Sequence, residues 1–248
     1  MARNKPSYIY VAYGYIAFFV LLALFNFYCL SSKGQTSHTR YVDVVNPTYS
    51  VLYDAEYQCP VLVCWSVTKK DIGGQDRRSK RYFKIDSRLP LPRAKDGDYT
   101  NTGWQRGHMV PAKDRSGSKA AFNSTFLMSN VAPMEPYLNQ ADWLLSEVAT
   151  RYLATRYRTI NVLAGALYLD SLPAIVGESR IRVPSHFWKV IYTTEPDTLA
   201  SLYLFANNSQ ILGLPSRRVR LWPPLPAEVK KKLPRFLQGD SIKFRQLK

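Results

Sequence analysis

Cysteine and histidine are scarce in this sequence, and each shortage argues against a class of protein. Three cysteines among 248 residues are too few for a disulfide framework. The sequence has no CxxC pair and no Cys/His cluster at zinc spacing, which argues against a structural zinc site. Cys59 and Cys64 are an odd number of positions apart. A continuous strand would therefore place them on opposite faces, as two buried thiols and not as a bridge.

Acidic residues are also few: 18 stand against 34 Lys and Arg, for a formal net charge of +16. Arg3, Lys5, Lys33 and Arg40 carry four of these charges, and no acid precedes Asp43, so the rest of the chain keeps a net +12. A globular part this basic favours a polyanionic partner, either nucleic acid or an anionic membrane surface. A generic solubilising surface is the alternative interpretation.

A long hydrophobic run, Tyr8–Leu30, contains no charged residue. As a helix it would cross roughly 30 Å of hydrocarbon, with aromatic residues suited to the interfaces. The run is long for a signal peptide and no A-x-A-like site follows it, so we predict an uncleaved transmembrane anchor. The basic N-terminus would place the bulk of the chain on the far side of the membrane from the cytosol or matrix. The expected segments are a tail (1–7), the anchor (8–30), a linker (31–45) and one globular domain (46–248).

Strand patterns dominate the globular part. β-branched and aromatic residues between turn signals predict strands over 49–57, 60–70, 159–169, 185–194 and 199–207, with a shorter one near 106–110. The clearest helix follows Pro136 and runs to about residue 157. A short helix is expected near Ala227. The apolar stripe of the long helix consists of Leu144, Leu145, Val148 and Tyr152.

Polar side chains also recur along that predicted helix. Asn139 and Glu147 lie eight residues apart, so they are about 80° apart around the axis and share one broad face. Arg151 stays close to that face, four residues after Glu147. An amide, a carboxylate and a guanidinium together suit a hydrated divalent metal held against a phosphate. A solvated face with an ordinary Glu–Arg pair is the alternative.

Three separated motifs carry a family resemblance. The order "QRGH", "MSNVAPMEPYLNQADWLLSE" and "VPSHFWKVIY" resembles the DNA/RNA non-specific endonuclease family, and the wording "SNVAP" and "LNQ" is most similar to its mitochondrial endonuclease G branch. The resemblance covers roughly residues 49–207. It implies an α+β fold, the ββα-metal nuclease, with a central antiparallel sheet and one long active-site helix.

The resemblance also implies roles for individual residues. His108 would be the general base that takes a proton from the attacking water. Asn139 would be the single protein ligand of Mg²⁺, with Mn²⁺ as a substitute, and Glu147 would order water at that cation. The other catalytic candidates are arginines that contact the phosphate or flank the base: Arg81, Arg106 and Arg151.

One position departs from the family pattern. The motif usually begins with Asp, where this chain has Gln105, which keeps hydrogen-bonding capacity but has no negative charge. Gly107 is expected to allow close backbone approach or a positive φ beside the base. Asn130 would either support the site or cap a turn. A basic run is expected to track nucleic-acid phosphates without reading sequence: Arg77, Arg78, Lys80 and Arg81.

The sequence therefore predicts a membrane-anchored, Mg²⁺-dependent endonuclease that cleaves DNA and RNA with little sequence preference. A catalytically weakened homologue that tethers nucleic acid at a membrane is the alternative, and a module that binds anionic lipid is a third. The endonuclease G resemblance and the acid-free N-terminus favour the mitochondrial inner membrane, with the domain in the intermembrane space. A bacterial inner membrane facing the periplasm is the alternative location, and a homodimer is left open.

Overall fold

The computed structural model describes residues 39–74, 82–169, 171–195, 199–208, 217–218 and 225–233. The expected anchor and the basic run 77–81, with its Arg77, Arg78, Lys80 and Arg81, lie outside these residues. Among the helices that are described, none has the length and apolar character needed to cross a bilayer.

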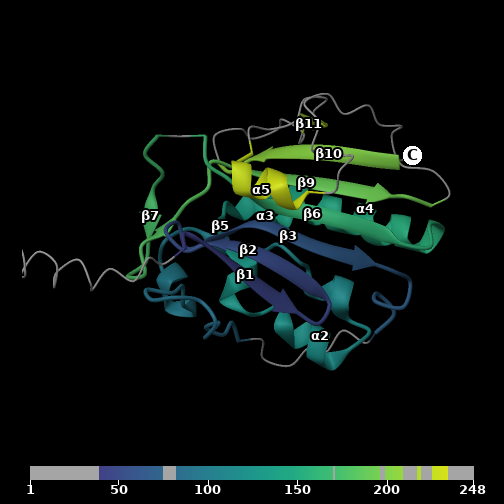
Figure 1. The fold of residues 1–248 in the computed structure, drawn as a ribbon, viewed down its shortest axis with the longest axis horizontal. Coiled ribbons are helices and arrows are strands. Elements are labelled where there is room, and N and C mark those ends of the chain that lie inside the picture. The colour runs from purple at the N-terminus through teal and green to yellow at the C-terminus, as the bar shows by residue number, and fades with distance from the viewer. Residues whose placement is uncertain are drawn as a thin grey trace, which may run out of the picture. The chain divides into compact units, whose positions relative to one another are not determined.

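A seven-stranded antiparallel sheet forms the centre of the domain, in the order β1-β2-β3-β6-β9-β10-β11 (Figure 1). Its strands are rich in the β-branched and aromatic residues that suit a pleated, buried surface. The predicted central antiparallel sheet is confirmed. The strands are β1 (Tyr41–Asn46), β2 (Tyr49–Asp54), β3 (Cys59–Val67), β6 (Ile160–Leu167), β9 (His186–Thr193), β10 (Leu199–Ala206) and β11 (Arg217–Arg218).

Both faces of this sheet are covered. Alternation along β9 sends Phe187 and Ile191 into one buried cluster and Trp188 and Val190 into another. The first cluster includes residues of the long helix, and the second includes Val229 of the C-terminal helix α5 (Ala227–Lys232). Figure 1 shows α5 on one side of the strands and α3 and α4 on the other. The side that carries α3 and α4 also carries the candidate site.

The two cysteines on β3 follow the predicted alternation. Cys59 belongs to the first buried cluster, whereas Cys64 packs against the second, and both thiols are free. Burial raises the pKa of the Cys59 thiol to about 12. The sheet begins earlier than expected, because β1 starts at Tyr41, inside the range assigned to the linker.

A second small sheet lies outside the central one. β4 (Gln105–His108) pairs antiparallel with β5 (Val131–Met134), and the chain passes from β5 directly into α3 (Pro136–Gln140). The remaining described elements are short: η1 (Asp96–Tyr99), η2 (Ala112–Arg115), α2 (Lys119–Ser124), η3 (Met128–Asn130), β7 (Ile175–Val176) and β8 (Ile181–Arg182).

The helix predicted after Pro136 is two helices. α3 ends at Gln140, and α4 (Asp142–Arg156) begins after Ala141, whose φ of −119° and ψ of −87° are not helical. Alanine is a strong helix former, so local propensity does not explain the break. The α4 register instead buries Trp143 completely, which is a requirement of tertiary packing. The expectation that one helix presents Asn139 and Glu147 on a shared face is therefore wrong.

The apolar stripe of α4 faces solvent. An amphipathic helix ordinarily turns such a stripe to the core. Here Leu145 is 63% exposed and Tyr152 is 54% exposed, and Leu144 and Val148 are exposed as well. The buried face carries small and polar side chains with a few apolar ones: Trp143, Ser146, Thr150, Leu153 and Ala154. The physical reason is the set of buried charges on the neighbouring elements, which need polar partners from α4.

Candidate active site

The strand that carries His108 is held by close packing. β4 and β5 pair with His108 opposite Val131 and Gln105 opposite Met134. A Cβ on Gly107 would lie 2.6 Å from the Met134 Cβ, well inside van der Waals contact. Of the two roles expected for Gly107, close approach is the one seen, since its φ is not among the positive values.

The His108 imidazole lies between two phenylalanine rings. Its centroid is 5.0 Å from that of Phe83 and 5.1 Å from that of Phe126, the latter in an edge-to-face arrangement. The backbone carbonyl of His108 accepts a hydrogen bond from the Trp143 indole at 3.0 Å, which ties β4 to α4. Aromatic packing and this tie restrict the ring to one region of the surface, where it is half-buried.

Asn130 supports the chain as it leaves β4. Its side chain is completely buried and makes three hydrogen bonds to the backbone. The Oδ1 accepts from the Val110 amide at 2.9 Å, and the Nδ2 donates to the carbonyls of Val110 and Thr125. The Asn130 side chain thus joins the segment that follows β4 to Thr125.

Arg106 lies two residues from His108, on the same side of β4, and shares its contact with Phe83. Its Nε is 2.5 Å from the Asp96 Oδ1, and its Nη2 donates to the Asp96 carbonyl at 2.7 Å. The guanidinium also lies over the Tyr99 ring, 5.4 Å from the centroid. Arg106 is therefore fixed beside the candidate base with its charge already paired.

Gln105 and Asn139 meet directly. The Asn139 Nδ2 donates to the Gln105 Oε1 at 2.7 Å, which joins β4 to α3 across 34 positions of sequence. Both side chains are half-buried. The bond uses the NH₂ of the Asn139 amide and leaves its oxygen as the acceptor.

Glu147 and Arg151 belong to a buried group of charges. The Arg151 Nη1 is 3.0 Å from the Oδ1 of Asp114, which is fully buried, and 3.8 Å from the Glu147 Oε2. The Trp65 indole donates to the other Asp114 oxygen at 3.0 Å. Burial raises the pKa of Glu147 to about 7, although the cations Lys189, Arg151 and Lys113 act in the opposite direction.

Lys189 also belongs to this group and, like Asp114, was missed by the sequence analysis. It is 1% exposed, its Nζ donates to the Ser146 Oγ at 2.7 Å, and the ammonium lies 3.5 Å from the Trp143 ring centroid. Burial lowers its pKa, against the pull of Glu147 and Asp114. The sequence did contain a signal for its burial. Lys189 is the one charged residue of the strand "HFWKVIYT" and lies on the same face as Phe187.

These contacts place the candidate residues in two groups, which Trp143 links. Gln105, Asn139 and His108 lie on β4 and α3, and Glu147 and its charged partners lie between α4, η2 and β9. Trp143 joins the groups, because its indole N–H reaches the His108 carbonyl while its ring receives the Lys189 ammonium.

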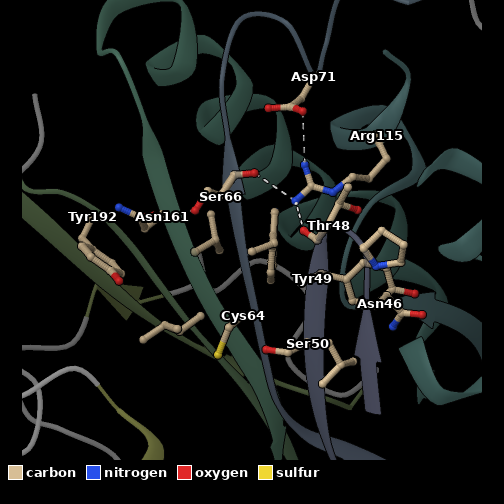
Figure 2. Close-up of a pocket in the computed structure, with 15 residues that line it drawn as sticks. Asn46, Thr48, Tyr49, Ser50, Cys64, Ser66, Asp71, Arg115, Asn161 and Tyr192 are labelled. Carbon is tan, nitrogen blue, oxygen red and sulfur yellow. Dashed lines mark hydrogen bonds and ion pairs between the residues drawn. The ribbon is translucent and has the colours of Figure 1, made fainter. Parts of the chain in front are cut away.

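A cavity of about 390 Å³ lies apart from these groups, since none of the candidate residues lines it. Arg115 closes one side of it with a buried guanidinium, as Figure 2 shows. Its Nη2 donates to the carbonyls of Thr48 and Ser66, and its Nη1 is 4.0 Å from the Asp71 carboxylate. Arg115 therefore cross-links the β1–β2 turn to the end of β3, and its role is structural.

Known proteins are similar to this chain. The model of the DNA/RNA non-specific endonuclease family matches residues 30–231. Human mitochondrial endonuclease G is 32% identical over 154 residues, which cover 58% of this chain and 52% of that protein. Human mitochondrial nuclease EXOG is 31% identical over 169 residues, with coverages of 62% and 46%. Mitochondrial nuclease 1 of Schizosaccharomyces pombe is 31% identical over 178 residues, with coverages of 65% and 55%.

A solved structure shares the fold. The crystal structure of the EndoG/EndoGI complex contains a chain that aligns with a TM-score of 0.63 and 28% identity, over 67% of this chain and 74% of its own length. This chain spans about half the length of the curated relatives named above. Because the family model matches most of its residues, including every motif that carried the resemblance, the chain belongs to the DNA/RNA non-specific endonuclease family.

Proposed function

We propose that this chain is a metal-dependent nuclease that hydrolyses phosphodiester bonds in DNA and RNA with little sequence preference. Family membership supports the reaction class. The observation that carries the proposal is the 2.7 Å bond between Gln105 and Asn139, because it brings the helix with the candidate metal ligand to the strand with the candidate base. The basic composition of the chain favours a polyanionic substrate.

His108 is assigned as the general base. The ring nitrogen of a neutral imidazole can accept the proton of a water molecule aimed at phosphorus. The packing of the ring against Phe83 and Phe126 limits its rotation, so the accepting nitrogen is pre-positioned. Arg106, whose charge is paired with Asp96, lies beside the base and also contacts Phe83.

Asn139 fits a hard divalent cation. Its amide oxygen is the donor type that Mg²⁺ prefers, and Mg²⁺ usually keeps several of its own waters. The described part of the chain holds no cluster of three or more His, Cys, Asp or Glu suited to a metal, so the proposal relies on this single amide. A bound Mg²⁺, or Mn²⁺ in its place, would stabilise negative charge on the phosphate and on the leaving 3′ oxygen. Glu147 is assigned to orient water at this position.

Arg151 is assigned to the substrate phosphate. A guanidinium has five N–H donors, and the contacts to Asp114 and Glu147 both use its Nη1. The remaining donors are suited to a bidentate phosphate contact. Phosphate binding by Arg81 and by the rest of the basic run 77–81 stays a prediction.

The test is the degradation of plasmid DNA and of RNA by the full-length chain, with Mg²⁺ or with EDTA. We expect cleavage with Mg²⁺ only, with 5′-phosphate and 3′-hydroxyl ends. His108→Ala should lower the rate by about 10²- to 10⁴-fold, which is the usual contribution of a general base, while nucleic-acid binding is retained. Cleavage that persists in EDTA, or a His108→Ala variant with the wild-type rate, would contradict the proposal.

A catalytically silent tether is the second candidate, and its support is Gln105 in the place of the usual Asp. The retained hydrogen bond to Asn139 favours the enzyme, because Gln105 still holds the candidate metal ligand. Binding of DNA without any cleavage in Mg²⁺, both by the wild type and by Gln105→Asp, would favour the tether.

We place the protein at the mitochondrial inner membrane, with the domain in the intermembrane space. The relatives reported above are named as mitochondrial, and the N-terminal tail is basic and acid-free. Cell fractionation followed by protease treatment with and without outer-membrane rupture tests this location. A homodimer stays a prediction, which light scattering of the detergent-solubilised chain can check.

A further inference from the structure

We propose that Gln105 is a positioning residue, which turns the oxygen of the Asn139 amide toward the divalent cation. This inference rests on the proposed function. The Gln105 Oε1 accepts from the Asn139 Nδ2 at 2.7 Å. A primary amide carries its oxygen and its NH₂ on opposite sides of the same carbon, so a bond that engages the NH₂ directs the oxygen the other way.

The backbone on both sides of this bond is fixed. Gln105 is paired with Met134 in the β4–β5 sheet. The backbone N–H of Asn139 donates to the backbone carbonyl of Glu135 at 2.9 Å, within the first turn of α3. Glu135 caps that helix through a 2.8 Å bond from the Leu138 amide to its Oε2. With both backbones held, only the rotamer freedom of the two side chains is lost when they meet.

Asn207 secures the start of α3 from a distant part of the chain. It is 4% exposed, and its Oδ1 accepts from the Glu135 amide at 2.8 Å. Its Nδ2 donates to the carbonyls of Pro133 and Pro184 at 3.0 and 2.8 Å. The helix that carries Asn139 is thus tied to β5 and to the segment before β9.

Gln105 supplies the acceptor without the charge of an aspartate. An amide does not titrate, so the orientation of Asn139 does not depend on the protonation of residue 105. The cation also meets one negative charge fewer than it would beside a carboxylate. Gln105 therefore preserves the geometry of the ligand while weakening the electrostatic attraction for the metal.

The experiment measures Mn²⁺ binding to the full-length chain without nucleic acid, from the loss of the free-Mn²⁺ EPR signal. Gln105→Met keeps the length of the side chain but removes the hydrogen-bond acceptor. Gln105→Glu keeps the shape of the side chain, and an ionised carboxylate can only accept hydrogen bonds. Asn139→Ala removes the ligand itself. Circular dichroism of each variant confirms the native fold, and the nearly isosteric Glu variant keeps the test valid if the Met variant does not fold.

We expect Gln105→Met to bind Mn²⁺ about 10-fold more weakly or worse, the usual effect of losing a residue that orients a metal ligand. Gln105→Glu should bind at least as tightly as the wild type. Wild-type affinity in Gln105→Met, while Asn139→Ala loses binding, would overturn this inference alone. So would a Gln105→Glu variant that binds Mn²⁺ about 10-fold more weakly than the wild type, because the Gln NH₂ would then be the group in contact. Wild-type affinity in Asn139→Ala would overturn the metal site of the proposed function, and this inference with it.

Discussion

Replacing Lys189 with Met should move the pH dependence of cleavage. Lys189 is buried, bonded to Ser146 and packed on Trp143, and its positive charge opposes the protonation of Glu147. Arg151, Lys113 and Asp114 also act on this carboxylate. Methionine fills a similar volume without the charge, so the change removes the first of the cations that keep Glu147 ionised.

The size of the effect follows from the pKa of Glu147, which is about 7 with Lys189 present. Half of the Glu147 side chains are then ionised at pH 7. An opposite charge nearby typically lowers a carboxyl pKa by about one to three units, so its loss raises the pKa by a similar amount. A rise of about one unit would cut the ionised fraction at pH 7 about fivefold, and a rise of about two units about fiftyfold.

The assay is kcat/KM for cleavage of a short DNA duplex between pH 5.5 and 9. If ionised Glu147 orients water, the acid limb of the Lys189→Met profile should lie at least one pH unit above that of the wild type, with activity partly recovered at high pH. Lys189→Arg is the matched control, since it keeps the charge and should keep the limb near its original position. An unshifted limb in Lys189→Met would refute the role given to Lys189, and a loss of activity that is uniform in pH would point to packing alone.

Two further predictions concern stability. The pKa of Glu147 is raised from 4.5 to about 7, so its burial weakens the fold as pH rises through this window and has no such effect below it. Glu147→Gln should therefore change the free energy of unfolding more favourably at pH 8.5 than at pH 4.5, by on the order of 1 to 3 kcal/mol in urea titrations; equal differences at the two pH values would refute the reasoning. Gly107→Ala should lower the free energy of unfolding by about 1 to 3 kcal/mol, because its Cβ would lie 2.6 Å from that of Met134. An unchanged urea midpoint for this variant would mean that the β4–β5 sheet shifts without cost in free energy.

The exposed stripe on α4 shows how a correct pattern can lead to a wrong placement. Periodicity identified a helix, and α4 is indeed helical. Periodicity cannot tell which face is buried when the neighbouring elements carry charges. Asp114 and Lys189 lie under α4, where they take polar partners from its inner face, Arg151 and Ser146.

The sequence by itself determined the family, the strands and the identities of the candidate residues. Alternating β-branched and aromatic residues are a local property, so the expected strands at 49–57, 159–169 and 185–194 agree with β2, β6 and β9 within a few residues. The odd spacing of Cys59 and Cys64 likewise sufficed to place them on opposite faces of β3.

Only the tertiary structure decided how the site is assembled. The break at Ala141, the bond from Gln105 to Asn139 and the burial of Lys189 against Ser146 each depend on residues that are distant in sequence. Local propensity favours a continuous helix at Ala141, and it does not decide the other two features. Their conformations follow from the need to bury Trp143 and to give every buried charge and amide a partner, which is a condition on the whole fold.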